Sequence, residues 1–160
     1  MGGLPARALA TLAAAAREAG DHHRDGSEAS AERGPWRLGL DMPRYIPVMT
    51  YADNRQLRET VYRAHVSRAS QGELDNTPLI EKILGLRAEQ AQRLGYAHWA
   101  ELSLASKMAD NVDAVEALLE ELRAAAKPAA EHEIEALKAC AGRHQAPEAS
   151  EMAPWDVTYW

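Results

Sequence analysis

The chain has 160 residues, a mass of 17.5 kDa, a formal net charge of −6 and a sequence pI of about 5.5. This negative charge argues against a general nucleic-acid binder, which normally carries a basic face. The apolar share is 46%, but it contains much alanine and no phenylalanine, so the composition favours helices over a dense core of large side chains.

The first element is predicted to be a helix followed by a polar loop. Pro5 suits the first turn of a helix and Gly20 ends the run, so the helix should cover residues 5–19. Residues 20–34 contain Gly, Ser, Asp and His with no period, which is typical of a loop.

The next segment is predicted to be extended. Trp36, Leu38 and Leu40 alternate with other residues at period two, and a β-branched and aromatic stretch broken by prolines follows as far as Tyr51. Prolines within such a stretch are typical of an edge strand. We therefore expect one short β-hairpin over residues 36–51.

From Asp53 the pattern becomes charged and helical. Asp53 is predicted as the N-cap and Gln56, three residues later, completes a capping box. The helix that follows should cover residues 54–70. Extended chain thus enters a helix within about two residues.

Two further helices are predicted in the middle of the chain. Thr77 as N-cap and Pro78 at the first helical position are a strong helix start, and Gly95 is the expected stop. A short helix over residues 98–104 follows.

The last long helix is predicted to begin at Asn111 and to be kinked or restarted at Pro128. Residues 143–153 should form a loop, after which Pro154 opens another helix. The predicted fold class is therefore mainly α, a single helical segment over residues 1–160 with one short β-hairpin.

Compartment and membrane association can also be judged from the sequence. The single cysteine, Cys140, excludes an intramolecular disulfide and fits a reducing compartment. No apolar run approaches the roughly 20 residues of a transmembrane helix, and the alanine-rich start lacks the basic region of a signal peptide. We expect a cytoplasmic protein with no nucleic-acid or membrane partner.

One short motif comes close to a metal site. Two histidines and a glutamate in the pattern His-Glu-x-x-His can bind zinc, because residues four apart share a helix face. Here His132 and Glu133 are followed by Ala136 in place of the second histidine, and Pro128, four residues earlier, has no ligand atom. We interpret His132 and Glu133 as solvated helix residues.

The other candidate ligands are interpreted in the same way. His22 and His23 are adjacent and cannot share a helix face; with Asp21 and Asp25 they could hold a stray metal, but a solvated loop is the simpler interpretation. Three further histidines are predicted to be packing or surface residues: His65, His98 and His144.

Nucleophilic catalysis finds no support in the sequence. Ser103 and Ser106 lack a Gly-x-Ser-x-Gly turn, and Cys140 has no evident histidine partner.

An acidic run on the last long helix is typical of a solvated face: Glu116, Glu120 and Glu121, with Arg123. Several aromatic residues are expected in a core, with the lining of a peptide channel as the alternative: Tyr45, Tyr51, Tyr62, Trp99 and Trp155. We predict no catalytic, cofactor-binding or metal-binding residue in this chain.

The amino-acid sequences of several segments nevertheless resemble those of a known family. Ile46-Pro47-Val48-Met49-Thr50-Tyr51-Ala52-Asp53-Asn54-Arg55 closely resembles zinc-dependent oligopeptidases of the thimet oligopeptidase and oligopeptidase A type. Further matches keep the same order along the chain: Arg58-Glu59, Asp75-Asn76, Leu86 to Ala91, Lys107-Met108-Ala109 and Pro154-Trp155-Asp156. Residues 70–74 are shorter than in the oligopeptidase A type and nearer the related dipeptidyl carboxypeptidases.

This resemblance implies a fragment of a zinc-dependent peptidase. Enzymes of the family are longer and mainly helical, and cleave short peptides, so the chain resembles an internal stretch upstream of the zinc-binding motif. We then expect it to bind no zinc and to be inactive by itself, its partners being the missing catalytic portion and, through the complete enzyme, short peptides. Two alternatives remain: a non-enzymatic helical interaction module that retains the scaffold, and a catalytic portion supplied by a separate chain.

Overall fold

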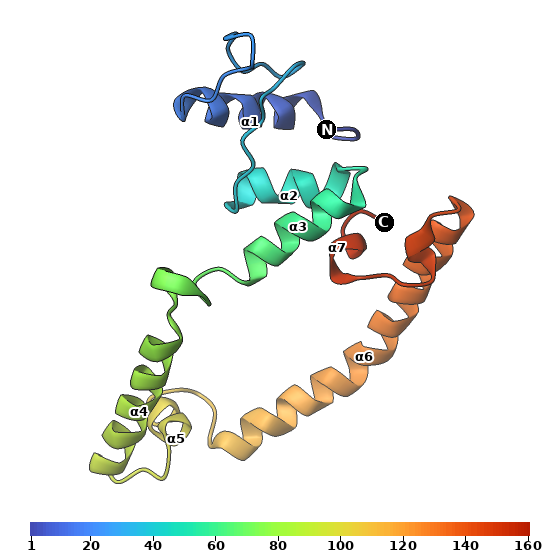
Figure 1. Ribbon diagram of the computed structural model, residues 1–160. Coiled ribbons are helices and arrows are strands. Elements are labelled where there is room, and N and C mark those ends of the chain that lie inside the picture. The colour runs from blue at the N-terminus through green and yellow to red at the C-terminus, as the bar shows by residue number, and fades with distance from the viewer. The chain divides into compact units, whose positions relative to one another are not determined.

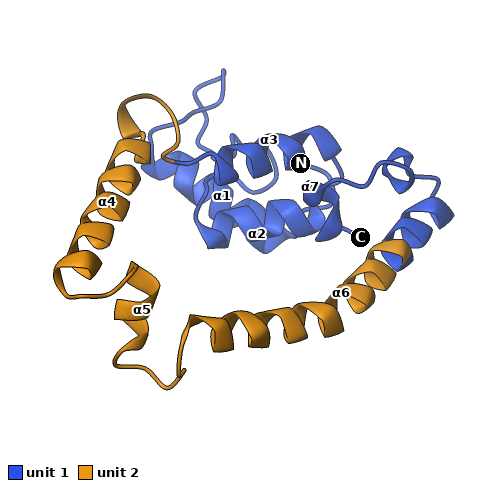
Figure 2. Cartoon of the chain, turned by 90° about the horizontal axis from the view of Figure 1, so that it is seen from below, with its two compact units in different colours: residues 1–68, 136–160 blue, residues 69–135 orange.

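The computed structural model describes residues 1–160 and is mainly helical, which confirms the predicted class (Figure 1). It contains seven α-helices and two single-turn 3₁₀ helices, and its only β interactions are isolated bridges between His22 and Glu28 and between Ser30 and Gly34. No helix is both long and apolar enough to span a bilayer. The chain divides into two compact units, residues 1–68 with 136–160 (unit 1) and residues 69–135 (unit 2) (Figure 2).

Unit 1 begins with α1 (Ala6–Glu18), which packs on α2 (Met42–Tyr51). This helix is one residue shorter at each end than the predicted 5–19: Pro5 is its N-cap instead of a residue of the first turn, and Gly20 follows its end with φ +76°. The main core lies where these helices meet α3, and five buried side chains form it: Leu4, Leu12, Val48, Ala52 and Val61.

The predicted β-hairpin over residues 36–51 is wrong, because residues 42–51 form α2. Tyr45, Val48, Met49 and Ala52 recur at the i, i+3, i+4, i+7 spacing of a helix, and the last three of them are buried. Pro43 lies in the first helical turn, where its missing N–H costs little. The two prolines thus led to the prediction of a strand although the apolar residues recur at helical spacing.

Residues 20–34 are held by side-chain hydrogen bonds to their backbone carbonyls, one from α1 and one from Trp36. Arg17 Nη1 donates to the carbonyl of Ala29 at 2.6 Å, and Trp36 Nε1 donates to the carbonyl of Ala31 at 3.2 Å. Ala29 packs in a second small core with Ala13 and Ala16 of α1. The segment therefore has a defined course without forming a helix or strand.

The helix α3 (Arg55–Val66) begins one residue later than predicted and ends at Val66, short of the predicted residue 70. The N-cap is Asn54, not Asp53, because Asn54 Oδ1 accepts from the backbone N–H of Leu57 at 3.0 Å. Asp53 instead accepts from the hydroxyl of Tyr159 at 3.2 Å. Two acceptor residues in succession made the cap ambiguous in the sequence.

Unit 2 contains η1 (Gly72–Leu74), α4 (Thr77–Arg93), α5 (Trp99–Leu104) and the first three-quarters of α6 (Val112–Arg143). The N-cap of α4 is Asn76, one residue before the predicted Thr77, while Gly95 follows the helix with φ +82° as expected of a stop. α5 packs on α4, and Arg87 of α4 lies over the Trp99 ring at 5.2 Å.

The helix α6 runs without interruption through Pro128, so the predicted restart is wrong. A proline inside a helix removes one hydrogen bond, but helical turns on both sides of Pro128 continue the 32-residue helix. The end of α6, from Ala136, belongs to unit 1, as do η2 (Pro147–Ala149) and α7 (Pro154–Val157), and α7 packs on α3.

Candidate functional site

The most highly organised polar group of the molecule lies in unit 1, between α3 and the segment 148–160. It consists of two arginines from α3 and two acidic residues from that segment, and we call it the arginine–carboxylate cluster: Arg55, Arg58, Glu148 and Asp156. Arg55 and Arg58 are three residues apart, so they lie on the same side of α3.

Asp156 is the centre of the cluster. Its carboxylate accepts from Arg55 Nη2 at 2.8 Å and from Arg58 Nη2 at 2.9 Å, and also from the backbone N–H of Ala153 at 3.0 Å. The side chains of Asp156 and Arg58 are both fully buried, whereas that of Arg55 is 36% exposed. The contact joins residues that are about one hundred positions apart in sequence.

Every donor nitrogen of Arg58 has a partner. Nη1 donates to the carbonyl of Ala52 at 2.7 Å, Nε donates to the carbonyl of Trp155 at 3.2 Å, and Nη2 also reaches Glu148 Oε1 at 3.4 Å. The guanidinium lies over the ring of Tyr159 at 3.9 Å. Such a planar donor fork suits buried ion pairs, and here it is used entirely within the protein.

The electrostatics of the cluster are balanced. Burial by itself would raise the pKa of Asp156, but the hydrogen bonds from Arg55, from the Ala153 N–H and from Arg58 outweigh it and hold the pKa below its ordinary value. The hydrogen bond to Asp156 raises the pKa of Arg55. Two positive and two negative side chains thus satisfy one another, so the cluster acts as a joint between distant segments.

Aromatic residues surround this joint. Trp155 lies 4.7 Å from Arg63 and 5.8 Å from the ring of Tyr62. Burial, followed by the hydrogen bond to Asp53, raises the pKa of Tyr159. Two of the five aromatic residues weighed from the sequence, Tyr62 and Trp155, therefore pack beside α3 and α7.

The other three have separate surroundings. Tyr45 stacks on His65 with ring centroids 4.1 Å apart, and Trp99 packs under Arg87. Tyr51 is half exposed and lines a groove of about 360 Å³ beside Pro43 and Pro47. The structure does not gather the five into one place.

His132 and Glu133 both lie exposed on α6, and Ala136 is one turn further along the same helix. No group of three or more His, Cys, Asp or Glu side chains has a geometry that could hold a metal ion. The residues present therefore do not fit a zinc site.

The remaining histidines lie apart from one another except for the adjacent His22 and His23. Of the two acids near that pair, Asp21 forms an ion pair with Arg37 at 3.1 Å and Asp25 with Arg33 at 3.2 Å. The other three histidines each meet a local partner: His65 stacks on Tyr45, His98 is the N-cap of α5, and His144 lies 5.6 Å from the ring of Trp160.

The nucleophile candidates are equally local. Ser103 Oγ accepts from Lys107 Nζ at 2.7 Å, and Cys140 is a half-buried free thiol on α6. In the acidic run of α6, Glu120 pairs with Arg123 at 2.6 Å on the surface.

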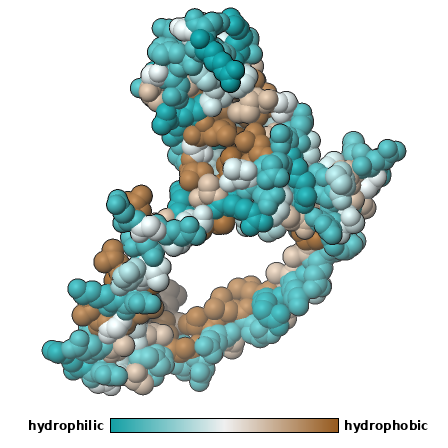
Figure 3. Space-filling model, viewed as in Figure 1, coloured by the Kyte–Doolittle hydropathy of each residue, from teal (hydrophilic) through white to brown (hydrophobic).

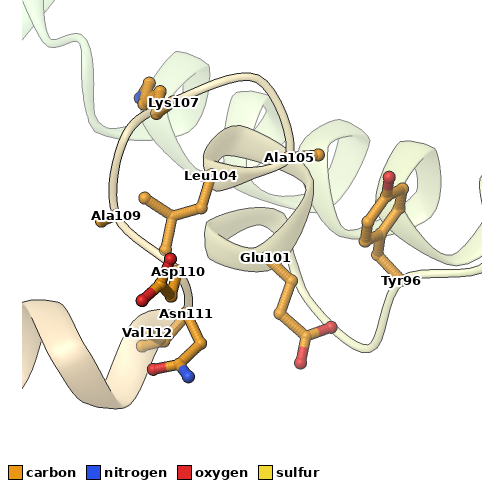
Figure 4. A pocket seen from close by; sticks show the side chains of 9 residues that line it. All are labelled: Tyr96, Glu101, Leu104, Ala105, Lys107, Ala109, Asp110, Asn111 and Val112. Atoms are coloured by element: carbon orange, nitrogen blue, oxygen red, sulfur yellow. The ribbon is translucent and has the colours of Figure 1, made fainter.

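Unit 2 contains a pocket of about 460 Å³ between α5 and the start of α6. Figure 4 shows Tyr96 at one end of this pocket and Asp110 and Asn111 at the other. Two of its polar groups serve the backbone: Glu101 Oε2 accepts from the Ala97 N–H at 2.8 Å, and Asn111 Oδ1 accepts from the Ala114 N–H at 2.8 Å. Glu101 and Asn111 of the pocket therefore satisfy backbone N–H groups at the starts of helices.

Sequence reasoning missed the arginine–carboxylate cluster. Viewed down the axis of the predicted helix, Arg58 projects between Val61 and Tyr62, on the inward face. A charge on an apolar face requires a buried counter-charge. That position was the available signal. The identity of the counter-charge, 98 residues away, had no local signal.

Comparison with known proteins places these features in context. The model of peptidase family M3 matches residues 48–160, a range that includes all four residues of the cluster. The chain is 49% identical over 158 residues to a probable cytosolic oligopeptidase A of Arabidopsis thaliana, covering 99% of this chain and 22% of that protein. It is 50% identical over 158 residues to the chloroplastic/mitochondrial organellar oligopeptidase A of the same plant, covering 99% of this chain and 19% of that protein.

A bacterial relative gives the same picture. Oligopeptidase A of Escherichia coli is 41% identical over 165 residues, covering 100% of this chain and 22% of that protein. The chain thus spans about a fifth of the length of the relatives it matches.

Proposed function

This chain belongs to peptidase family M3, and we propose that it is the scaffold part of an oligopeptidase that hydrolyses short peptides. The observation that carries the proposal is identity of 41–50% to three oligopeptidases A over 99–100% of the chain. The complete enzyme would act on peptides, while this stretch supplies helices and the arginine–carboxylate cluster instead of reacting groups.

Zinc is the cofactor that the family resemblance implies for the complete enzyme. The residues of this chain do not fit it, because Ala136 occupies the position of a second histidine after His132 and no other ligand cluster exists. We propose that the zinc ligands and the base that activates water lie outside this stretch, and that the isolated chain is inactive. We also propose the cytoplasm as its location, supported by the relative that is named cytosolic.

A helical interaction module is the second candidate function. The specific observation in its favour is that large apolar side chains of α4 and α6 are exposed, among them Leu79, Leu86, Leu118 and Leu122. Side chains of this kind on helices usually pack against another polypeptide. Both candidates share this surface, and peptidase activity separates them.

The decisive experiment measures cleavage of a quenched short peptide by the purified 160-residue chain with added zinc. We expect no cleavage above buffer, while intact oligopeptidase A of Escherichia coli serves as the positive control. A His132→Ala variant identifies a contaminating peptidase, whose activity it would leave unchanged. Metal-dependent cleavage that His132→Ala abolishes would sink the proposal that the chain lacks the chemistry.

The two candidate functions are separated by transplantation. The chain is inserted into the Escherichia coli enzyme in place of the aligned stretch, and peptide cleavage by the hybrid is measured. Activity supports a peptidase scaffold. A folded, inactive hybrid favours the interaction module.

A further inference from the structure

The first half of α6 carries an apolar surface that the chain itself leaves uncovered. Leu118, Leu119 and Leu122 are 56–59% exposed, and they continue the helix face on which Val112 and Val115 lie. Figure 3 shows this apolar surface along α6. We call these five side chains the α6 leucine stripe.

The stripe begins at an apolar hollow. Trp99 and Leu104 of α5, together with Val112 and Val115, line a depression of about 280 Å³ between α5 and α6. A helix commonly binds to an apolar hollow that continues into an exposed apolar helix face. One side chain of the bound helix fills the hollow, and its next turns cover the exposed face. The hollow and stripe therefore form one continuous surface within unit 2.

The charges beside the stripe are acidic. Glu116 and Glu121 fall on opposite sides of it by helical position, and residues 112–122 contain no Lys or Arg. Residues 69–135 as a whole carry six Lys and Arg against thirteen Asp and Glu, a formal net charge of −7. Two stripes facing each other would bring glutamates together, so like-with-like pairing of α6 is disfavoured.

We propose that the α6 leucine stripe docks a helix that is apolar in its centre and bordered by Lys or Arg, supplied by the remaining polypeptide of the peptidase. This proposal rests on the proposed function, since it names the partner of the scaffold. In the relatives that match this chain from end to end, about four-fifths of the polypeptide lies outside the matched stretch, which is ample to supply such a helix.

The test uses the hybrid in which this chain replaces the aligned stretch of Escherichia coli oligopeptidase A. Leu119 is replaced by cysteine, and its reaction with a maleimide is followed by mass spectrometry in the isolated chain and in the hybrid. We expect labelling in the hybrid to be at least about tenfold slower, because covered side chains react only after local opening. Met108→Cys is the matched control, since Met108 is fully exposed in unit 2 away from the stripe, and its rate should be equal in both.

The charge of the partner is tested separately. Glu121→Lys in the Leu119→Cys hybrid should speed labelling severalfold at low salt, and this effect should fade at about 1 M salt, where the Debye length is about 3 Å. Glu73→Lys changes the net charge equally at an exposed site outside α6 and should leave the rate unchanged. Equal effects of the two reversals would overturn the basic border.

Three further results would overturn the docking proposal. Equal labelling of Leu119→Cys in the isolated chain and the hybrid would show the stripe uncovered. Protection in the isolated chain that grows with concentration would identify a second copy as the occupant. Fast labelling in a second, active hybrid, built on the cytosolic Arabidopsis relative that is 49% identical, would show that the stripe stays uncovered in a correctly folded enzyme. Peptide cleavage by either hybrid keeps the proposed function independent of these outcomes.

Discussion

Replacing Asp156 by alanine tests whether the arginine–carboxylate cluster holds the segment 148–160 on α3. The substitution removes the acceptor that Arg58 Nη2 contacts at 2.9 Å and Arg55 Nη2 at 2.8 Å. Arg55 is partly exposed and can turn to water, but Arg58 is fully buried and cannot. Breaking a buried pair from one side costs about 3–5 kcal/mol because it strands the other charge.

The expected loss lies near the lower end of that range, at about 3 kcal/mol, because Arg58 keeps a weaker acceptor. Glu148 Oε1 remains at 3.4 Å and the Ala52 carbonyl at 2.7 Å. The assay is hydrogen exchange of the backbone amides of residues 153–160, which reports local opening even if the two units unfold separately. A change of about 3 kcal/mol corresponds to roughly a hundredfold faster exchange.

Two companion variants make the result specific. Glu120→Ala breaks an exposed pair with Arg123 and should leave the exchange rates of residues 153–160 almost unchanged. The double replacement Arg58→Met with Asp156→Leu removes both charges of the closest buried pair, but it leaves buried Glu148 with only the N–H of Trp160, so it should recover part of the loss. Exchange in Asp156→Ala that is no faster than in Glu120→Ala would refute the view that this joint is held by charge.

Four further predictions follow from single features of the structure. Asn54→Ala should lower the free energy of unfolding by about 1 kcal/mol in urea, whereas Asn54→Asp keeps the cap and should be near neutral. Gly3→Ala should lower the melting temperature more than Gly20→Ala, because a Cβ at Gly3 overlaps a backbone carbonyl at the end of α2 while Gly20 has open space and only its positive φ. Pro128→Ala restores a hydrogen bond in an exposed turn and should stabilise α6 by up to about 3 kcal/mol, seen in far-ultraviolet circular dichroism melts. The pKa of Asp156 in the folded protein lies below the ordinary 3.8, so its carboxylate should stabilise the fold fully above that pH and lose this contribution as the pH falls below it. Urea midpoints of the wild type should therefore fall more steeply with acid than those of Asp156→Asn.

Local sequence chemistry predicted most helices but not every period. Gly95 and Pro78 marked the ends of α4 because their backbone preferences act within one or two residues. Residues 42–51 failed because Pro43 and Pro47 suggested a strand, although the spacing of Val48, Met49 and Ala52 is helical. Packing of that apolar face against α1 and α3 outweighs the hydrogen bond that Pro47 removes.

The candidate site could be predicted only in part, for a different physical reason. A buried charge on a helix face requires a partner, so Arg58 announces that a counter-charge exists somewhere in the fold. Which of the chain's 24 acidic residues supplies it depends on how the chain closes over about one hundred residues, and no period or cap encodes that choice.

Two of the segments that carry the family resemblance also close unit 1. The opening stretch ends in Asp53-Asn54-Arg55, and the last matching segment is Pro154-Trp155-Asp156. In the structure these two segments meet, through the ion pair between Arg55 and Asp156 at 2.8 Å and the hydrogen bond from Tyr159 to Asp53 at 3.2 Å. On the proposal that neither segment carries reacting groups, the shared sequence of these two segments marks a joint between distant parts of a scaffold. A substitution in the joint should therefore alter the peptidase through stability, lowering the amount of folded enzyme while the activity of each folded molecule is retained.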